Sequence, residues 1–415
     1  MQTLIKDGLV IPANGRERIE QGVVAIEDGR ITAVGKATEF SEPSAQTEVI
    51  DAAGCTVLPG LIDCHVHVFT YPLVSGFSEA KATVWATNYL RTALRAGVTT
   101  IRDLASPWDA IFALRDAVEE GWIVGPRMRV AGQAITMTGG HGYDDGTVEA
   151  DGPVAVMQAA REQLKKGADL IKLMATGGVA TFGELPTSYQ LEMEEMHAAV
   201  QEAHKRGKPT SAHAYATAGI KNALLAGIDC IEHGVYLDDE SIGMMVKNDV
   251  ALCPTFSVYA RIIQGGKAGL VPQYRVQKAA KLMESQGESF RKAVAAGVKI
   301  VLGTDAVSVH HPLGEVALEL ELLVENGMAP LAAIEAGTRS AAEVCQVDQE
   351  VGTLEPGKKA DVLIVKGNAL ADIGAAQKVS RVLRDGITVY DAAKERLLEG
   401  MIGRPVLKNP WHSSD

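Results

Sequence analysis

The chain has 415 residues, of which 47% are hydrophobic and 22% charged, as is typical of a globular protein with one large and one smaller domain. Its net charge of −12 argues against nucleic acid or an anionic membrane as partner, because no basic stripe is available to meet phosphates. The five cysteines lack CxxC spacing, which favours reduced thiols and a cytoplasmic setting. The start, MQTLIKDGLVIPANG, does not resemble a signal peptide, and no apolar run approaches the roughly 18 residues of a membrane helix.

Both ends of the chain have a β-rich texture. Residues 1–57 alternate short apolar runs with Asp-Gly and Asn-Gly pairs, which predicts hairpins in a small sheet. The same texture returns near Gly352, in GTLEPGKKADVLIVKG and SRVLRDGITVYDAA. We therefore predict that residues 1–57 and 349–408 pair as one split β-sandwich domain.

The middle of the chain, residues 58–348, alternates short apolar runs with Ala-rich amphipathic stretches. A repeated strand-then-helix pattern predicts a parallel α/β sheet. The candidate strands are LIDCHVHVF, VTTIRDL, RMRVAGQAIT, DLIKLMATG, PTSAHAY, CIEHGV, ALCPTF and KIVLGTD. Eight strands of this kind close a (β/α)8 TIM barrel, which is the fold we expect.

Metal-ligand side chains stand at the ends of these candidate strands, where barrels carry their catalytic groups. His65 and His67 are two apart on a strand, so both project to one face and can share an ion. Alone, this HxH pair could be two surface histidines. The complete set indicates a metal centre: His65, His67, Lys172, His213, His233 and Asp305.

Each of the later members has a second interpretation. Lys172 lies in an apolar strand, so its amine either extends out at the strand end or has reacted with carbon dioxide to form a carbamate that can bridge two metals. His213 and His233 are either core or loop histidines, or a ligand pair for a second ion. Asp305 is either a helix N-cap or both a ligand and the proton shuttle.

Together these motifs resemble the amidohydrolase superfamily with a binuclear centre, supported by the stretches LPGLIDCHVH, AGVTTIRDL, TGGHG, GTDA and PGKKADVLIV. The stretches TGGHG, IKLMATGG and IEHG are most similar to the branch of metal-dependent dipeptidases, which includes prolidases acting on Xaa-Pro dipeptides. Imidazolonepropionase is a relative with a mononuclear centre and no bridging lysine. Lys172 weighs against that activity here.

The resemblance implies two divalent ions, most simply zinc, with carbon dioxide bound as N6-carboxylysine at Lys172. A metal-bound hydroxide would cut the amide bond, and Asp305 would accept its proton and pass it to the leaving nitrogen. In the resembling prolidases, two positions that match His141 and Tyr236 contact the substrate carboxylate.

Several other residues near the expected site are weaker candidates. Tyr143, His310 and His311 would stand at the same mouth. We expect Arg102 to be salt-bridged within the scaffold rather than to anchor substrate. Cys64 lies between the two first-strand histidines, so it should point to the opposite face.

We therefore expect a binuclear zinc-dependent amidohydrolase that hydrolyses small peptides, Xaa-Pro dipeptides first. One alternative is the same centre acting on another amide, carbamate, urea, lactone or N-acyl amino acid, because fold and metals do not fix the substrate. Another is a non-catalytic scaffold relative, in which ligand losses would be expected. The expected partners are a small-molecule substrate and further copies of the chain in a homo-oligomer.

Overall fold

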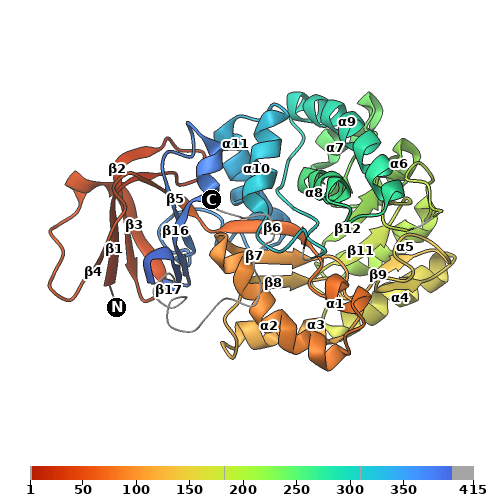
Figure 1. The fold of residues 1–415 in the computed structure, drawn as a ribbon, viewed down its shortest axis with the longest axis horizontal. Helices are drawn as coiled ribbons and strands as arrows, with labels where there is room; N and C mark the ends of the chain where they lie inside the picture. Colours follow the sequence, from red (N-terminus) through yellow and green to blue (C-terminus); the bar gives the residue numbers. More distant parts are fainter. Residues whose placement is uncertain (1, 182, 309, 395–415) are drawn as a thin grey trace.

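The computed structural model describes residues 2–181, 183–308 and 310–394. Figure 1 shows a β-rich part at one end of the molecule and, beside it, a larger part in which helices surround parallel strands. The predicted residues 395–408 of the C-terminal β-rich segment lie outside the described residues. None of the described helices combines the length and apolar character that crossing a membrane requires.

The two chain ends form one continuous eight-stranded sheet. Its strands run in the order β17 (Ile387–Asp391), β16 (Val379–Arg384), β15 (Val362–Lys366), β5 (Cys55–Pro59), β1 (Gln2–Val10), β2 (Ile19–Glu27) and β3 (Arg30–Lys36), with β4 (Glu48–Asp51) also pairing with β1. The ends meet where β5 and β15 pair antiparallel. Short 3-10 helices, η1 (Ala37–Glu39) and η2 (Ile373–Gln377), flank the strands. The predicted pairing of both chain ends in one small β-rich part is confirmed, and the bounds 1–57 and 349–408 stay a prediction.

Two of the hairpins in this sheet turn at Asp-Gly pairs. Asp28 and Gly29 join β2 to β3, and Asp385 and Gly386 join β16 to β17. All four residues have positive φ, the conformation that a two-residue hairpin turn needs. A Cβ on Gly386 would lie 2.6 Å from the Cα of Gly29, so the two turns pack directly against each other.

The barrel contains every predicted strand. Its assigned strands are β6 (Leu61–Val66), β7 (Val98–Asp103), β8 (Arg127–Val130), β9 (Ala134–Thr136), β11 (Ile171–Met174), β12 (Thr210–Ala214), β13 (Cys230–His233) and β14 (Ala251–Cys253); β8 and β9 divide the third predicted run, and β10 (Thr147–Glu149) pairs with β9. Residues 299–305 take the place of the eighth barrel strand (the eighth stave), between β14 and β6. Backbone hydrogen bonds join them to both: Val301 N–H donates to Leu252 O (2.9 Å), and Cys64 N–H donates to Leu302 O (2.9 Å). The (β/α)8 barrel is therefore confirmed.

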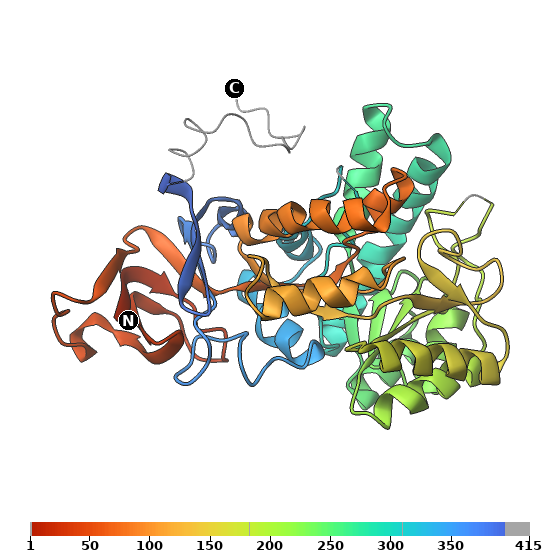
Figure 2. The same ribbon diagram turned by 90° about the horizontal axis from the view of Figure 1, so that it is seen from below.

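Helices connect the strands and cover the barrel. They are α1 (Thr70–Val74), α2 (Glu79–Arg95), α3 (Ala110–Glu119), α4 (Pro153–Lys166), α5 (Met193–His204), α6 (Thr217–Ala226), α7 (Asp239–Asn248), α8 (Phe256–Lys267), α9 (Gln273–Ala296), α10 (Val316–Glu325), α11 (Pro330–Ala336) and α12 (Arg339–Val344). Local signals set their ends: α4 starts with proline and stops at Gly167 in the left-handed conformation, as helix termini prefer. Figures 1 and 2 both show α2 and α3 lying side by side along one flank. The apolar faces of the barrel helices pack on the strands in one large hydrophobic core.

Candidate active site

All six predicted ligand residues line one cavity of about 250 Å³ at the carboxyl ends of the barrel strands. They come from the barrel strands in chain order: β6 and the residue after it, β11, β12, β13 and the eighth stave. In that order they are His65, His67, Lys172, His213, His233 and Asp305. Parallel strands bring their carboxyl ends to one rim, so residues up to 240 positions apart meet here.

His65, His67 and Asp305 form the first half of the cluster. Asp305 Oδ1 lies 3.2 Å from His67 Nε2 and 3.5 Å from His65 Nε2, and the two Nε2 atoms are 3.3 Å apart. His67 Nδ1 donates to the carbonyl of Ala105 at 3.3 Å, so Nε2 carries the lone pair. Asp305 has φ of 57°, and the next described helix after it is α10 (Val316–Glu325), so it is not a helix N-cap.

His213 and His233 form the second half. His213 Nε2 donates to the carbonyl of Gly177 at 3.2 Å, which leaves Nδ1 as its lone-pair nitrogen. His233 Nδ1 is bonded to Thr255 Oγ1 at 2.7 Å, and its Nε2 faces His213 Nδ1 at 3.0 Å. Each imidazole is thus held by one nitrogen and presents the other to its neighbour, the arrangement of histidines that ligate a metal.

Lys172, on β11, is the sixth member of the cluster. Its side chain is buried, with 2% of the residue's surface exposed. Burial lowers the pKa of its amine, although Glu232 and Asp305 oppose the shift. A lowered pKa favours the neutral amine, which is the form that adds to carbon dioxide. Four imidazoles, one carboxylate and a buried amine of lowered pKa line this cavity, and histidine nitrogens and carboxylate oxygens are donors that divalent ions accept.

The surroundings set the protonation states of the six predicted ligand residues. Burial lowers the pKa of His65 to about 4, and burial together with neighbouring cationic groups lowers the pKa values of His213 and His233 well below the ordinary value. These imidazoles are therefore neutral at neutral pH. Burial alone would raise the pKa of Asp305, but His65 and His67 hold it far below the usual value, so the carboxylate is ionised.

His141, expected to contact substrate, also lines the cavity. Its ring stacks on that of His213 with centroids 4.2 Å apart. Its Nδ1 lies 2.9 Å from Glu184 Oε2, which leaves Nε2 for a ligand. A Cβ on Gly178 would lie 2.1 Å from His141 Cε1, so only glycine permits this approach.

Tyr236, the other expected substrate contact, is not among the described residues that line the cavity. Its backbone N–H donates to the carbonyl of Tyr215, and its half-buried ring packs against an apolar cluster that includes Tyr215 and Tyr259. Both of those tyrosines do line the cavity. The substrate role of Tyr236 stays a prediction.

The weaker candidates divide in a similar way. His310 and His311 line the cavity, and His311 Nε2 donates to the carbonyl of Thr304 at 2.7 Å. Tyr143 is 49% exposed and lies outside the described lining. Cys64 points away from the cavity, with its Sγ 3.8 Å from Cys345 Sγ.

Sequence reasoning missed several residues of the site. Asp145, on the loop after β9, and Arg275, on α9, also line the cavity. Burial raises the pKa of Asp145 to about 6.

Sequence reasoning also missed Glu232, one residue before His233. Its side chain is fully buried and ion-paired with Arg102. Burial would raise the pKa of Glu232, but Arg102 and His65 hold it well below the usual value. A glutamate inside the apolar run CIEHGV was the signal for it.

Comparison with known proteins agrees with this geometry. Ochratoxinase from Aspergillus niger is 32% identical over 420 residues, covering 92% of this chain and 84% of that protein. The crystal structure of a Xaa-Pro dipeptidase with bound methionine in its active site superposes with a TM-score of 0.86 at 32% identity, over 94% of this chain and 100% of that one. A prolidase complexed with N-methylphosphonate-L-proline has a TM-score of 0.87 at 29% identity, with the same coverage.

The match also extends to a whole family. The amidohydrolase family model matches residues 56–389, a span that starts in β5 and ends in β17 and includes the entire barrel. All six ligand-type residues lie inside this span. On the fold, the converging ligands and this match, the chain belongs to the amidohydrolase family.

Proposed function

We propose that the chain is a binuclear metal-dependent dipeptidase, with zinc as the simplest ion, that hydrolyses small peptides carrying a free carboxylate. Xaa-Pro dipeptides are the first candidates. The observation that carries this proposal is the convergence of four imidazoles, Lys172 and Asp305 on one cavity. The similarity to a Xaa-Pro dipeptidase and a prolidase supports the choice of substrate.

The chain's own residues supply the binding and the proton transfer. His65, His67 and Asp305 would hold one ion, His213 and His233 the other, and a carbamate on Lys172 would bridge them. When bound, such ions activate a water molecule and polarise the substrate carbonyl. Asp305 accepts a proton from the attacking water and passes it to the leaving nitrogen, because an amide nitrogen leaves poorly unless protonated.

The size and lining of the cavity fit a small substrate with one negatively charged end and one apolar end. The volume of about 250 Å³ is near the lower limit of ligand pockets, about 300 Å³. Val258 and Ile262 of α8 form an apolar wall. His141 and the guanidinium of Arg275 provide positive or hydrogen-bonding groups for a carboxylate. The substrate carboxylate is proposed to bind His141 and Tyr236, and the Tyr236 side chain would have to turn from its apolar cluster towards the cavity to do so.

A substrate panel on metal-loaded protein tests the proposal. We expect Ala-Pro to be hydrolysed, and Ala-Pro-amide to lose roughly ten- to a hundred-fold in kcat/KM, because a hydrogen bond to a charged group contributes about 1.5–3 kcal/mol. The panel also contains ochratoxin, N-acyl amino acids, aryl amides, carbamates and ureas. If Ala-Pro is inert while one of these turns over well, the dipeptidase assignment is wrong and the alternative amide or carbamate hydrolase takes its place.

Two tyrosine variants test how the carboxylate is held. Tyr236→Phe should lower kcat/KM for Ala-Pro by about ten- to a hundred-fold and should no longer distinguish the acid from its amide. Tyr215→Phe is the matched comparison, since Tyr215 lines the cavity. If only Tyr215→Phe shows the loss, Tyr215 and not Tyr236 holds the carboxylate. A protein that binds no metal and cleaves nothing in the panel would instead be a scaffold relative.

A further inference from the structure

A chain of buried polar contacts runs from His65 into the interior of the barrel. Glu232 Oε2 lies 2.8 Å from His65 Nδ1. The other oxygen, Oε1, accepts from the guanidinium of Arg102 at 2.7 Å and from Ser211 Oγ at 2.5 Å. Arg102 also donates its Nε–H to the carbonyl of Cys64 at 2.6 Å, directly before His65. Arg102 and Glu232 have 1% and 0% of their surfaces exposed.

We propose that Glu232 and Arg102 are positioning residues for the metal centre. Glu232 accepts the Nδ1–H of His65, which fixes the tautomer whose lone pair is on Nε2. That Nε2 is the atom that faces His67 and Asp305. Arg102 holds the carboxylate from the opposite side and fixes the backbone next to His65. The inference rests on the proposed metal centre but not on any substrate.

Stability alone is a weak explanation for a buried ion pair such as Arg102–Glu232. Removing two charges from water is expensive, and well-packed apolar residues of similar volume often serve a buried position equally well or better. The histidine contact, in contrast, is what a ligating imidazole needs, since its second nitrogen is usually bonded to a carboxylate or carbonyl. The other three histidine ligands use Ala105 O, Gly177 O and Thr255 Oγ1 for this purpose.

Glu232 could instead be a ligand itself, because Glu232, Cys253 and His65 offer ligand atoms within 4.8 Å of one another. Both of its oxygens, however, are already within hydrogen-bond distance of donors in the protein. An ion at that place would have to compete with the guanidinium of Arg102. The geometry therefore favours a carboxylate that serves His65.

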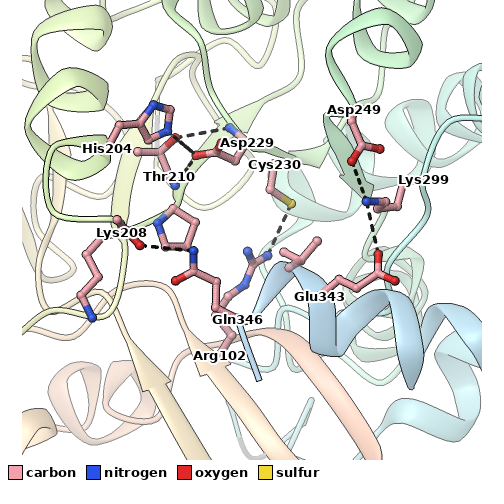
Figure 3. Close-up of a pocket in the computed structure, with 13 residues that line it drawn as sticks. Arg102, His204, Lys208, Thr210, Asp229, Cys230, Asp249, Lys299, Glu343 and Gln346 are labelled. Carbon is pink, nitrogen blue, oxygen red and sulfur yellow. Dashed lines mark hydrogen bonds and ion pairs between the residues drawn. The ribbon is translucent and has the colours of Figure 1, made fainter. Parts of the chain in front are cut away.

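A second cavity gives access to this chain from the other end of the barrel. It has a volume of about 430 Å³ and is lined by residues that begin strands, among them Thr210, Cys230 and Lys299. Arg102 forms part of its wall, and Figure 3 shows the guanidinium directed towards Cys230, 3.5 Å from the sulfur. A small cation can thus reach the position of the Arg102 side chain without passing the active site.

The decisive experiment is a metal titration that needs no substrate. In the double variant Arg102→Met/Glu232→Leu the buried charges are replaced by apolar side chains, so the fold should persist. The dissociation constant for Zn²⁺, measured by competition with a chelator, should rise by about ten- to a hundred-fold. The visible absorption of the Co²⁺-loaded protein should shift as well. A folded variant with unchanged affinity and spectrum overturns the proposal.

Two further variants complete the design. Ser211→Ala removes a contact to the same carboxylate but leaves His65 untouched, so its Zn²⁺ affinity should match the parent. Glu232→Gln decides the matter if the double variant does not fold: weaker binding supports the proposal and unchanged binding overturns it. A parent protein that binds no metal would refute the proposed function, whereas equal binding by parent and variants refutes only this inference.

Chemical rescue tests Arg102 separately. Arg102→Ala leaves a space beside the second cavity, and added methylguanidinium should recover at least part of the lost Zn²⁺ affinity. Arg127→Ala, which removes an ion pair with Asp361 away from the cavity, is the matched control and should show no such recovery. Loss of affinity in Arg102→Ala with no response to methylguanidinium would remove Arg102 from the proposal.

Discussion

At the residue scale, Lys172 carries the strongest chemical prediction. Lys172→Ala removes the amine that would form the bridging carbamate, so bound metal should fall below two ions per chain and most activity should be lost. A small added carboxylic acid can occupy the vacated space and should partly restore both. Elemental analysis and Ala-Pro hydrolysis, each with and without acetate, check this. Full activity in Lys172→Ala would exclude the carbamate.

Asp305 carries a prediction about proton transfer. Asp305→Asn keeps the side-chain shape but cannot accept a proton, so kcat should fall by roughly 10²–10⁴. Because the same carboxylate lies 3.2 Å from His67, metal content must be measured alongside the rate. Near-normal turnover in a fully metal-loaded Asp305→Asn protein would remove Asp305 from the mechanism.

Single residues were predictable when their chemistry conflicts with their surroundings. Lys172 inside an apolar strand and histidines two apart on a strand stand out in the sequence, and the structure brings them to one cavity. Glu232 stands out in the same way, as a glutamate inside an apolar run, but its pairing with Arg102 could not be found, since the two are 130 residues apart in sequence. Arg275 was missed for a related reason: it lies on α9, whose packing against α8 and α7 is not visible in the sequence.

At the element scale, the approach of a loop glycine to His141 makes a testable prediction. The side-chain methyl of Gly178→Ala would meet His141 at 2.1 Å and must displace the ring. We expect kcat/KM for Ala-Pro to fall by about ten-fold while metal content stays constant, since His141 is not a proposed ligand. The matched control is Gly243→Ala in α7, where an added Cβ meets nothing within 4 Å. A drop in both variants would contradict the contact argument.

The sequence pattern predicted the barrel strands better than the points at which strands end and loops begin. All eight staves were identified from apolar runs, because a strand buried on both faces is apolar throughout. The eighth stave has only isolated bridges to Leu252 and Val66, so its end at Asp305 follows from backbone bonds that no pattern encodes. The position of Tyr236 also depends on such a detail, the bond from its N–H to the carbonyl of Tyr215.

At the scale of the whole molecule, the buried histidines make stability depend on pH. Burial lowers the pKa values of His65, His213 and His233 in the folded state, that of His65 to about 4. In the unfolded chain they return to about 6.5, so the unfolded state binds more protons as the pH falls below that value. The metal-free protein should therefore lose stability as the pH falls from about 7 towards 4.

Thermal melting of chelator-treated protein at a series of pH values measures this effect. His213→Gln removes one of the titrating groups and should make the decline shallower. His197→Gln, outside the cavity, is the control and should keep the slope of the parent. A metal-free protein whose melting temperature is level between about pH 7 and about pH 5 would contradict the prediction.

The sheet built from both chain ends has a consequence for biosynthesis. β5 has two paired positions with β1 but five with β15, and Thr56 Oγ1 donates to the carbonyl of Gly367, 311 residues further along. On the ribosome, β5 is therefore released long before its main partner exists, with an open edge that other chains can join. The barrel is complete in sequence before this edge is closed. Translation that stalls between the barrel and β15 should thus yield aggregating chains rather than a smaller working enzyme.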